Sequence, residues 1–533
     1  MLGRPLLAFV VAANALACSE YGTSGVARDA GVDADGGDAG PVDLGGPHLT
    51  ALDVWSTDGS ASIGLVPTFS PFVFDYYVRC VEGKNPVTVS MTAAPGASSA
   101  VTLPTTSRSS PQLTHSLTVR ENQAIVVTAT AESQTAEYWI RCLPHDFPQL
   151  QMEAHAEAAT PLPGYYLVGN SGTTPGYAMV LDGNGVPVWY FASPESGVDD
   201  VDNVVPGAIS FFQTWRAAPL SVRHLSTAMT SFAMPSGIEL DAHELRVLPN
   251  GNYLVLTDPL VTGVDLSAIA GRGFSNPGGR SGIGAHTAYT QMFDCRAVEF
   301  DPKAGTVVWT WTASEHFDPL KDSINAAVAN ESGVVAVDAF HCNSIDVDPA
   351  NGNLLVSSRN MSSIFYVDRS TGAVVWKMGG SSYTKDNATY VPLDDAFIQQ
   401  HDARLQPGWS AATGTGQVSI FDDQSNTHAR ARGLLLDVTT GVGGTAPKAT
   451  VAWQYEGDGN SSNRGSFRIS ADGSRVIGWG SNTVRHRAFT EVDAEGHALL
   501  DFFFMDGNVS YRAIKVPLGT FDLGVLRRTA GLR

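Results

Sequence analysis

Three histidines stand at the same place in three similar stretches of the sequence, and an arginine follows the second of them. His243, His341 and His401 each open a short apolar run of the kind that forms a strand. A neutral imidazole can attack phosphorus or sulfur, or carry a proton, and the guanidinium of Arg359 is a fixed fork of donors suited to phosphate, sulfate or carboxylate. We therefore expect these four residues to form one site that handles an oxyanion.

The same residue types fit two other interpretations. Three histidines can bind zinc and leave one coordination position open, as in a metal-dependent hydrolase or lyase. The fixed charge of Arg359, which we expect beside His341, disfavours a cation, so we predict no metal. The other interpretation is a polar cluster that only fills a channel.

An internal repeat that starts near residue 160 supplies the elements that position these residues. Its unit is an aliphatic run, an Asp, a Gly and a second apolar run ending on an aromatic residue. Asn-Gly turns between alternating apolar runs add a second hairpin, so each unit has four strands. With a degenerate copy at 205–235, six units predict an all-β, six-bladed β-propeller over 160–525. The recognisable copies are Asp182–Trp189, Asp301–Trp309, Asp368–Trp376, Asp437–Trp453 and Asp493–Phe502.

Strand pairing predicts which residues meet in this fold. The first strand of each blade lies nearest the axis, so the three histidines should face a shared channel. If the hairpin after His341 turns around Ala350 and Asn351, position 345 faces 355, 343 faces 357, and His341 faces Arg359. The same count places His243 near Asp258, which would orient its imidazole.

Composition narrows the class of protein and its partners. Only 16% of the 533 residues are charged, and 54 Gly and 29 Pro favour short strands and turns. A formal net charge of -20 repels nucleic acid and anionic lipid.

The N-terminus predicts export. Arg4 precedes an apolar run, 6–17, that is shorter than the roughly 20 residues needed to span a bilayer. Small residues before Cys18 resemble the site at which bacterial lipoproteins are cleaved and acylated; the alternative is ordinary cleavage near Ala17. Residues 1–18 are thus read as a signal peptide, and 19–47, rich in Gly, Ala and Asp, as a disordered tether. The mature protein should be a lipoprotein, or periplasmic or secreted.

Residues 48–146 alternate apolar runs with Ser, Thr, Pro and Gly turns, which predicts a small β-sandwich similar to cadherin-like repeats. Cys80 and Cys142 close strand-like runs at its two ends, and we expect a disulfide between them. Cys295 and Cys342 either pair as well or remain buried thiols.

Several motifs in this order resemble bacterial arylsulfate sulfotransferases over roughly 160–520. They are His243-Glu244-Leu245, Phe340-His341-Cys342-Asn343-Ser344-Ile345, Ser357-Ser358-Arg359-Asn360-Met361, Val375-Trp376-Lys377-Met378-Gly379-Gly380, Gln400-His401-Asp402-Ala403-Arg404-Leu405 and Ile420-Phe421-Asp422-Asp423. The resemblance implies a six-bladed propeller behind a β-sandwich. It also implies transfer of a sulfuryl group from an aryl sulfate to a phenol by a ping-pong route through a sulfated histidine, with no nucleotide donor and no cofactor.

The resemblance also assigns roles. It makes His401 the nucleophile, has His341 and Arg359 bind the sulfuryl oxygens, and gives His243 a part in proton transfer or sulfate binding. Asn343 lies inside a matching motif and is a candidate substrate-binding residue. Arg404 and Arg432 are further candidates, with surface or inter-blade ion pairs as the alternative.

Two other functions remain open at this point. One is a non-catalytic propeller that binds a sulfated or carboxylated ligand. The other is the metal-dependent hydrolase or lyase that would use the histidine cluster.

Overall fold

The computed structural model describes residues 45–59, 63–155, 160–194, 197–213, 220–224, 230–232, 234–272, 289–331, 333–482 and 484–531. The chain divides between Gly45 and Gly46 into two units. The predicted signal peptide, Cys18 and nearly all of the predicted tether lie outside the described residues. Within the described ranges, no helix has the length and apolar character that a membrane crossing requires.

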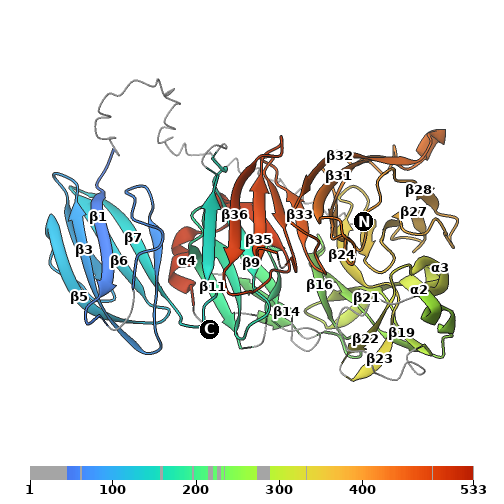
Figure 1. Cartoon of the computed structure of the whole chain (residues 1–533), viewed down its shortest axis with the longest axis horizontal. Coiled ribbons are helices and arrows are strands. Elements are labelled where there is room, and N and C mark those ends of the chain that lie inside the picture. The colour runs from blue at the N-terminus through green and yellow to red at the C-terminus, as the bar shows by residue number, and fades with distance from the viewer. Residues whose placement is uncertain are drawn as a thin grey trace, which may run out of the picture. The chain divides into compact units, whose positions relative to one another are not determined.

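Two sheets follow Gly46 and share one apolar core, as a β-sandwich does (Figure 1). Val87 and Val89 from the first sheet and Ile125 and Val127 from the second are fully buried in this core. The first sheet has the order β1 (Leu49–Ser56), β3 (Lys84–Ala93), β5 (Gln112–Arg120); the second has the order β2 (Asp75–Arg79), β7 (Gln134–Leu143), β6 (Ala124–Ala131), β4 (Ser98–Leu103). The predicted Cys80–Cys142 disulfide is confirmed.

Seven further sheets among the described residues have four or five strands each, and six of them surround one axis, so the predicted all-β, propeller-like architecture is confirmed. From the inner strand outward they are β37 (Ala513–Pro517), β9 (Gly164–Gly169), β10 (Gly176–Leu181), β11 (Pro187–Ser193); β12 (Asp199–Asp202), β13 (Ala208–Phe212), β14 (Leu220–His224), β15 (Thr230–Phe232); β16 (Asp241–Val247), β17 (Tyr253–Thr257), β20 (Arg296–Asp301), β21 (Thr306–Thr312); β24 (Cys342–Val347), β25 (Leu354–Ser358), β26 (Ser363–Val367), β27 (Val374–Gly379), β28 (Thr389–Val391); β29 (His401–Leu405), β30 (Thr415–Asp422), β31 (Arg432–Thr439), β32 (Lys448–Glu456); and β33 (Ser466–Ile469), β34 (Arg475–Gly478), β35 (Arg487–Val492), β36 (Ala498–Phe504), β8 (Leu150–Ala154).

The inner strands form a closed ring. Each contacts the next in the order β37, β12, β16, β24, β29, β33, and β33 returns to β37. The first strands of successive sheets therefore surround one axis, which is the arrangement that brings residues from distant parts of the sequence to a common site.

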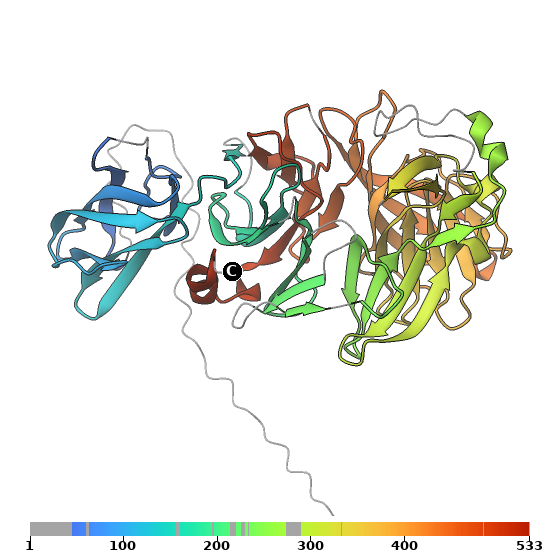
Figure 2. The ribbon, with the colours of Figure 1, turned by 90° about the horizontal axis from the view of Figure 1, so that it is seen from below.

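Chain segments from both ends of the propeller close this ring. β37 pairs with β9, so the first sheet takes its inner strand from near the C-terminus. β8 pairs with β36 and becomes the outermost strand of the last sheet. In Figures 1 and 2 the red strands of the last sheet accordingly lie beside the teal strands of the first. The propeller therefore begins before residue 160, because β8 has no partner in the sandwich sheets.

The repeated Asp-Gly motif is the turn between the third and fourth strands of a sheet. In its first copy Asp182 accepts backbone N–H groups of Asn184 and Val186 at 2.8 and 2.9 Å, and Gly185 has a φ of 74°, which favours glycine. Trp189, which ends this copy, is fully buried. The motif is therefore structural.

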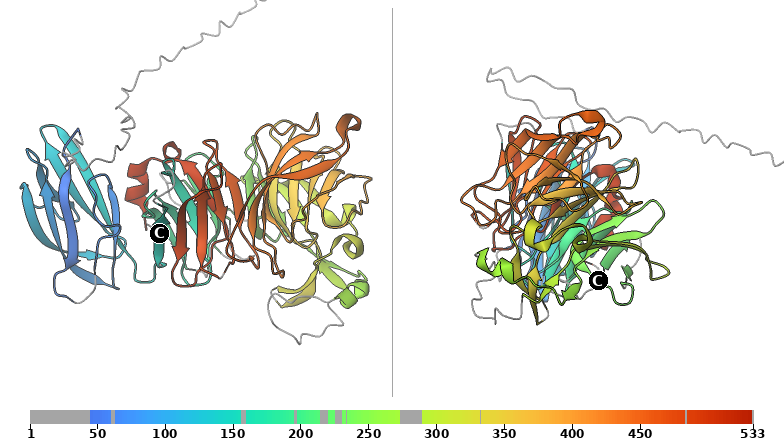
Figure 3. Two further views of the ribbon diagram at one scale, coloured as in Figure 1. Left: turned by 45° about the horizontal axis from the view of Figure 1, so that its top comes forward. Right: turned by 90° about the vertical axis from the view of Figure 1, so that its right-hand side faces the viewer.

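Two insertions between the third and fourth inner strands add a separate small sheet and three short helices. The sheet contains β18 (Leu260–Thr262), β19 (Gln291–Phe293), β23 (Val334–Asp338) and β22 (Ala327–Glu331); the helices are η1 (Ser267–Arg272), α2 (Ala313–His316) and α3 (Pro319–Asp322). The left view of Figure 3 shows this yellow-green region at the lower right. A last helix, α4 (Leu523–Thr529), follows β37.

A second disulfide joins the segment between β19 and β20 to the fourth sheet. Cys295, next to β20, is bonded to Cys342, the first residue of β24 and the neighbour of His341. The sequence left this pair undecided between a disulfide and two thiols. The bond holds the start of an inner strand where a predicted site residue lies.

Removal of this disulfide should destabilise the propeller. The bond closes a loop with a sequence separation of 47, for which loop-closure entropy gives about 4 kcal/mol. Urea unfolding of Cys295→Ser/Cys342→Ser should therefore show a loss of that size. Cys80→Ser/Cys142→Ser is the matched control, because it should destabilise the sandwich and leave the propeller transition in place. A propeller transition unchanged in the first variant would contradict the prediction.

Candidate active site

A break in the strand pairing occurs at each of the three histidines. The register shifts between Asp241 and Leu245 in β16, between Cys342 and Ser344 in β24, and between His401 and Arg404 in β29. Such bulges re-aim side chains at strand ends and are common beside active sites. The three histidines therefore leave the regular alternation at the same end of three neighbouring inner strands.

His341 and Arg359 are neighbours, as predicted, although the register differs from the prediction. Ile345 pairs with Val356 rather than with residue 355, which is one position further along the partner strand. The bulge after Cys342 compensates for this shift, and the backbone N–H of Arg359 donates to the carbonyl of His341 at 2.9 Å.

Each histidine has a carboxylate at Nδ1. For His243 it is Asp241 and not the predicted Asp258, since the register of β16 shifts by three residues between Asp241 and Leu245 and changes what faces the imidazole. For His341 it is Asp338 at 2.5 Å, and for His401 it is Asp423 at 2.7 Å. A carboxylate in this position fixes the tautomer and the ring orientation.

The histidines also lie close to one another. The rings of His243 and His341 are in an edge-to-face contact with centroids 5.0 Å apart. Arg359, His243 and His341 all act electrostatically on His401. The structure thus brings together the four residues that the sequence placed at one site.

The hydrogen bonds of His401 define its tautomer. Nδ1 faces Asp423, while Nε2 lies 3.2 Å from the backbone N–H of Arg464, which is a donor. Nε2 must therefore accept, and the proton of the neutral ring belongs on Nδ1, directed at the carboxylate. Nε2 carries the lone pair, as a nucleophile requires.

Burial keeps the nucleophile candidate neutral. His401 is 2% exposed, and burial lowers its pKa well below 6.5, with the charge of Arg359 acting in the same direction. Burial also lowers the pKa of His243. The carboxyl group of Asp423 shifts the other way, since burial raises its pKa and Arg359 only partly opposes this.

This environment predicts how His401 titrates. Because its folded-state pKa lies below 6.5, the ring should stay neutral at pH 6.5, where half of an ordinary histidine is protonated. Nitrogen NMR of histidine-labelled protein should show an unprotonated Nε2 there, with the signal assigned by its loss in His401→Asn. An imidazolium signal at pH 6.5 would contradict the tautomer and the electrostatic argument together.

Arg359 is buried and held from several sides. Its Nη1 donates to Asn360 Oδ1 at 3.1 Å and its Nη2 to the carbonyl of Ser462 at 2.9 Å. With its amide oxygen turned toward the guanidinium, Gln399 accepts from both nitrogens. Nε has no protein partner among the described residues. A guanidinium that is fixed in place and keeps one buried donor without a partner is suited to bind an anion beside the histidines.

The three additional substrate-binding candidates are engaged elsewhere. Asn343 donates to the carbonyl of Gln400 at 2.7 Å. Arg404 pairs with Glu244 and Asp402, and Arg432 pairs with Asp395 and Asp422. These contacts match the ion-pair alternative stated for the two arginines.

A network of buried charges inside the ring was not found from the sequence. Arg512 is fully buried and bonds to Asp200 at 2.6 Å and to Glu244 at 3.1 Å. Asp200, Asp202 and Glu244 are, among the described residues, the group whose oxygens approach closely enough for a cation, and Arg512 already neutralises two of them. The histidines do not form such a group, which disfavours the zinc interpretation.

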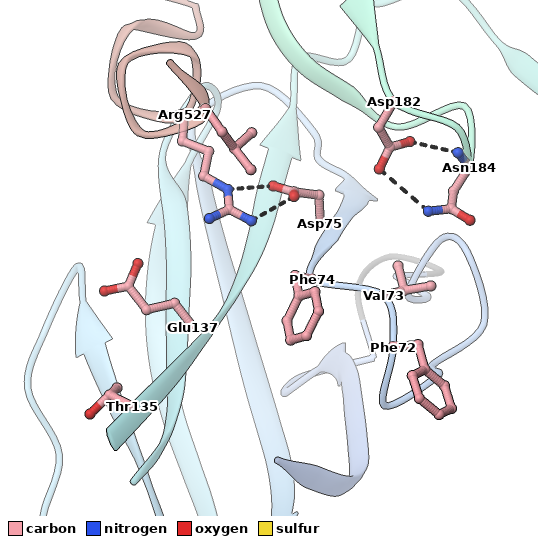
Figure 4. A pocket seen from close by; sticks show the side chains of 10 residues that line it. Phe72, Val73, Phe74, Asp75, Thr135, Glu137, Asp182, Asn184 and Arg527 are labelled. Atoms are coloured by element: carbon pink, nitrogen blue, oxygen red, sulfur yellow. Dashed lines mark hydrogen bonds and ion pairs between the residues drawn. The ribbon is translucent and has the colours of Figure 1, made fainter. Parts of the chain in front are cut away.

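A separate cavity of about 540 Å³ contains none of the predicted site residues. Figure 4 shows Asp75 paired with Arg527 in its wall, and Asp182 bonded to Asn184. Both carboxylates are thus engaged in structural contacts.

Comparison with known proteins gives a family. A family model described as Arylsulfotransferase (ASST) matches residues 226–504, which include all four residues of the site. Curated protein sequences gave no match.

Two solved structures show only a remote likeness. Apo AztD from Citrobacter koseri has 10% identity and a TM-score of 0.33, covering 67% of this chain and 98% of AztD. A chain of a nidogen/laminin complex has 11% identity and a TM-score of 0.32, covering 66% of this chain and 97% of its own. At these scores neither likeness carries an argument.

Proposed function

The chain belongs to the arylsulfotransferase (ASST) family, and on this premise we propose that it moves a sulfuryl group from an aryl sulfate to a phenol through a sulfated His401, without a nucleotide donor. The observation that carries the proposal is the environment of His401: burial that keeps it neutral, Nδ1 directed at Asp423, and Nε2 left as an acceptor, with the charge of Arg359 acting on the ring.

In the first half-reaction Nε2 of His401 attacks the donor's sulfur. The N–S bond forms from the nitrogen lone pair while the S–O bond to the aryl group breaks, and its electron pair leaves on the aryl oxygen. The Nδ1 proton balances the positive charge of the sulfated ring by shifting toward Asp423, whose burial raises its pKa. Arg359 offsets the charge on the sulfuryl oxygens, which is the main requirement of a loose transition state.

Exposure separates the roles of the other two histidines. The side chain of His341 is 25% exposed and that of His243 is 3% exposed. We assign proton exchange with the aryl oxygen to His341, which solvent reaches, and sulfuryl binding to His243. The resemblance instead has His341 bind the sulfuryl oxygens and allows His243 either role.

The second half-reaction returns the enzyme to its first state. The phenol gives its proton to His341 as its oxygen attacks sulfur. The N–S bond breaks, its electron pair returns to Nε2, and the proton that had shifted toward Asp423 returns to Nδ1. His341 ends as it began, because it gives a proton to the departing aryl oxygen in the first half-reaction.

The test is a transfer assay in the presence of a metal chelator. Purified protein, 4-nitrophenyl sulfate and an excess of phenol should give nitrophenolate and phenyl sulfate in equal amounts. Nitrophenolate without phenyl sulfate would indicate a hydrolase, and no product would indicate a binding protein. Either outcome would contradict the proposal.

We propose in addition that the protein is exported and that Cys18 anchors it through a lipid. Two disulfides support an oxidising compartment. Cells expressing Cys18→Ala should release the protein from the membrane fraction, and an unchanged distribution would exclude the anchor.

A further inference from the structure

One loop of the last sheet contacts three groups of the site. The loop, Ser461–Arg464, precedes β33. The backbone N–H of Ser461 donates to the carbonyl of Asp423 at 2.9 Å, and the carbonyl of Ser462 accepts from Arg359 at 2.9 Å. The backbone N–H of Arg464 donates to Nε2 of His401 at 3.2 Å. The loop therefore lies next to both the nucleophile candidate and the guanidinium of Arg359.

The side chain of Arg464 extends in the other direction around the ring. Its Nη2 lies 3.8 Å from Asp199, in the inner strand of the second sheet. Asp199 already accepts the hydroxyl of Ser171 at 2.6 Å, and the Arg464 side chain is 24% exposed. A long, partly exposed ion pair contributes little free energy, so this guanidinium can leave Asp199 at small cost.

Both donors of Arg464 can find new acceptors during transfer. When Nε2 of His401 bonds to sulfur, it no longer accepts the Arg464 N–H, and three sulfuryl oxygens are then placed around that position. The charges of Arg359 and Arg512 both act on His401, but Arg512 is already paired with Asp200 and Glu244. A second cation would stabilise negative charge on those sulfuryl oxygens that Arg359 does not reach.

We propose that Arg464 is a further sulfuryl-binding residue: its backbone N–H passes from Nε2 of His401 to a sulfuryl oxygen, and its guanidinium leaves Asp199 to bind the same group. The inference rests on the proposed function and adds a residue that the three histidines and Arg359 do not include. No bond other than those of the two half-reactions forms or breaks.

The backbone conformation offers a clean variant. Arg464 has a φ of 67°, a left-handed value that glycine adopts without strain. Arg464→Gly therefore keeps the N–H and removes only the guanidinium, with no expected loss of stability. Asp199→Asn is the matched variant, since it frees the guanidinium without removing it.

The two variants should change sulfuryl binding in opposite directions. We expect Arg464→Gly to lower kcat/KM for transfer from 4-nitrophenyl sulfate by about 10-fold to 100-fold, and to weaken the rise in melting temperature produced by inorganic sulfate. Asp199→Asn should keep or raise both. Arg464→Lys should recover part of the loss.

A different pattern is expected if the Arg464–Asp199 ion pair only holds the loop in place. Both variants would then open the loop and change activity in the same direction. That result, or an Arg464→Gly enzyme equal to wild type, would overturn the inference. If wild type itself shows no transfer, the proposed function fails first, and sulfate-dependent melting of wild type and Arg464→Gly still tests whether Arg464 binds the anion.

Discussion

His401→Ala should lower transfer from an aryl sulfate by about 10⁴-fold or more, the size of loss seen when a covalent nucleophile is removed. The imidazole supplies a lone pair on Nε2 that is directed away from Asp423 and toward the backbone N–H of Arg464, and the charge of Arg359 acts on the same ring. Neither His243 nor His341 replaces it, because each is held in its own position by an aspartate, Asp241 and Asp338 respectively. The loss should appear in kcat, with both donor and acceptor saturating.

His497→Ala is the control for this variant. His497 is also a histidine bonded to an aspartate, Asp493 at 2.9 Å, but its side chain is 71% exposed and lies in the outer hairpin of the last sheet. Its removal should leave transfer within about 2-fold of wild type. His401→Asn should be inactive as well while keeping a donor toward Asp423, which separates loss of chemistry from loss of fold. Transfer by either His401 variant at a tenth of the wild-type rate would exclude this nucleophile.

Arg359→Lys should lower kcat/KM by about 10²- to 10³-fold, although the charge is retained. The guanidinium is held by Asn360 and Ser462 so that its remaining donor is free in the buried site. An ammonium group keeps neither this geometry nor the reach of the fork. The effect should be larger for donors with poorer leaving groups, which depend more on stabilisation of charge at the sulfuryl oxygens.

Arg432→Lys tests whether the effect is specific to the site. Arg432 is also a largely buried arginine, but it is paired with Asp395 and Asp422. Its replacement should reduce stability and change transfer only a few-fold. Equal losses in the two variants would mean that Arg359 acts through the fold and not on the sulfuryl group.

The sequence predicted the architecture because repeats and turn residues are local signals. Asp182 and Gly185 define one turn without any knowledge of the rest of the chain, and the copies of this motif define the sheets. The strand β8 escaped this reasoning, because its partner β36 lies at the far end of the chain and its own residues carry no repeat signal.

The sequence predicted which residues form the site better than it predicted how they contact one another. The hairpin count placed His341 beside Arg359, although it assumed an unbulged strand; two errors of one residue compensated. At His243 the offset was larger, and the predicted partner Asp258 gave way to Asp241. A bulge has no sequence signature as clear as a turn, so side chains next to one are assigned wrongly by counting.

Two kinds of residue were beyond the sequence argument. Asp423 lies in a motif that was recognised without a role, and only the distance to His401 gives it one. Arg464 contacts His401 through its backbone N–H, which any residue type would provide, so the sequence carried no signal for this contact.

The central claim is a covalent sulfuryl group on His401, and mass spectrometry after incubation with donor alone tests it most directly. Wild type exposed to 4-methylumbelliferyl sulfate without phenol should release one equivalent of 4-methylumbelliferone. The peptide containing His401 should then gain the mass of one sulfuryl group and lose it when phenol is added. An unmodified His401 peptide beside an active enzyme, or an adduct at His243 or His341 that phenol discharges, would contradict the account.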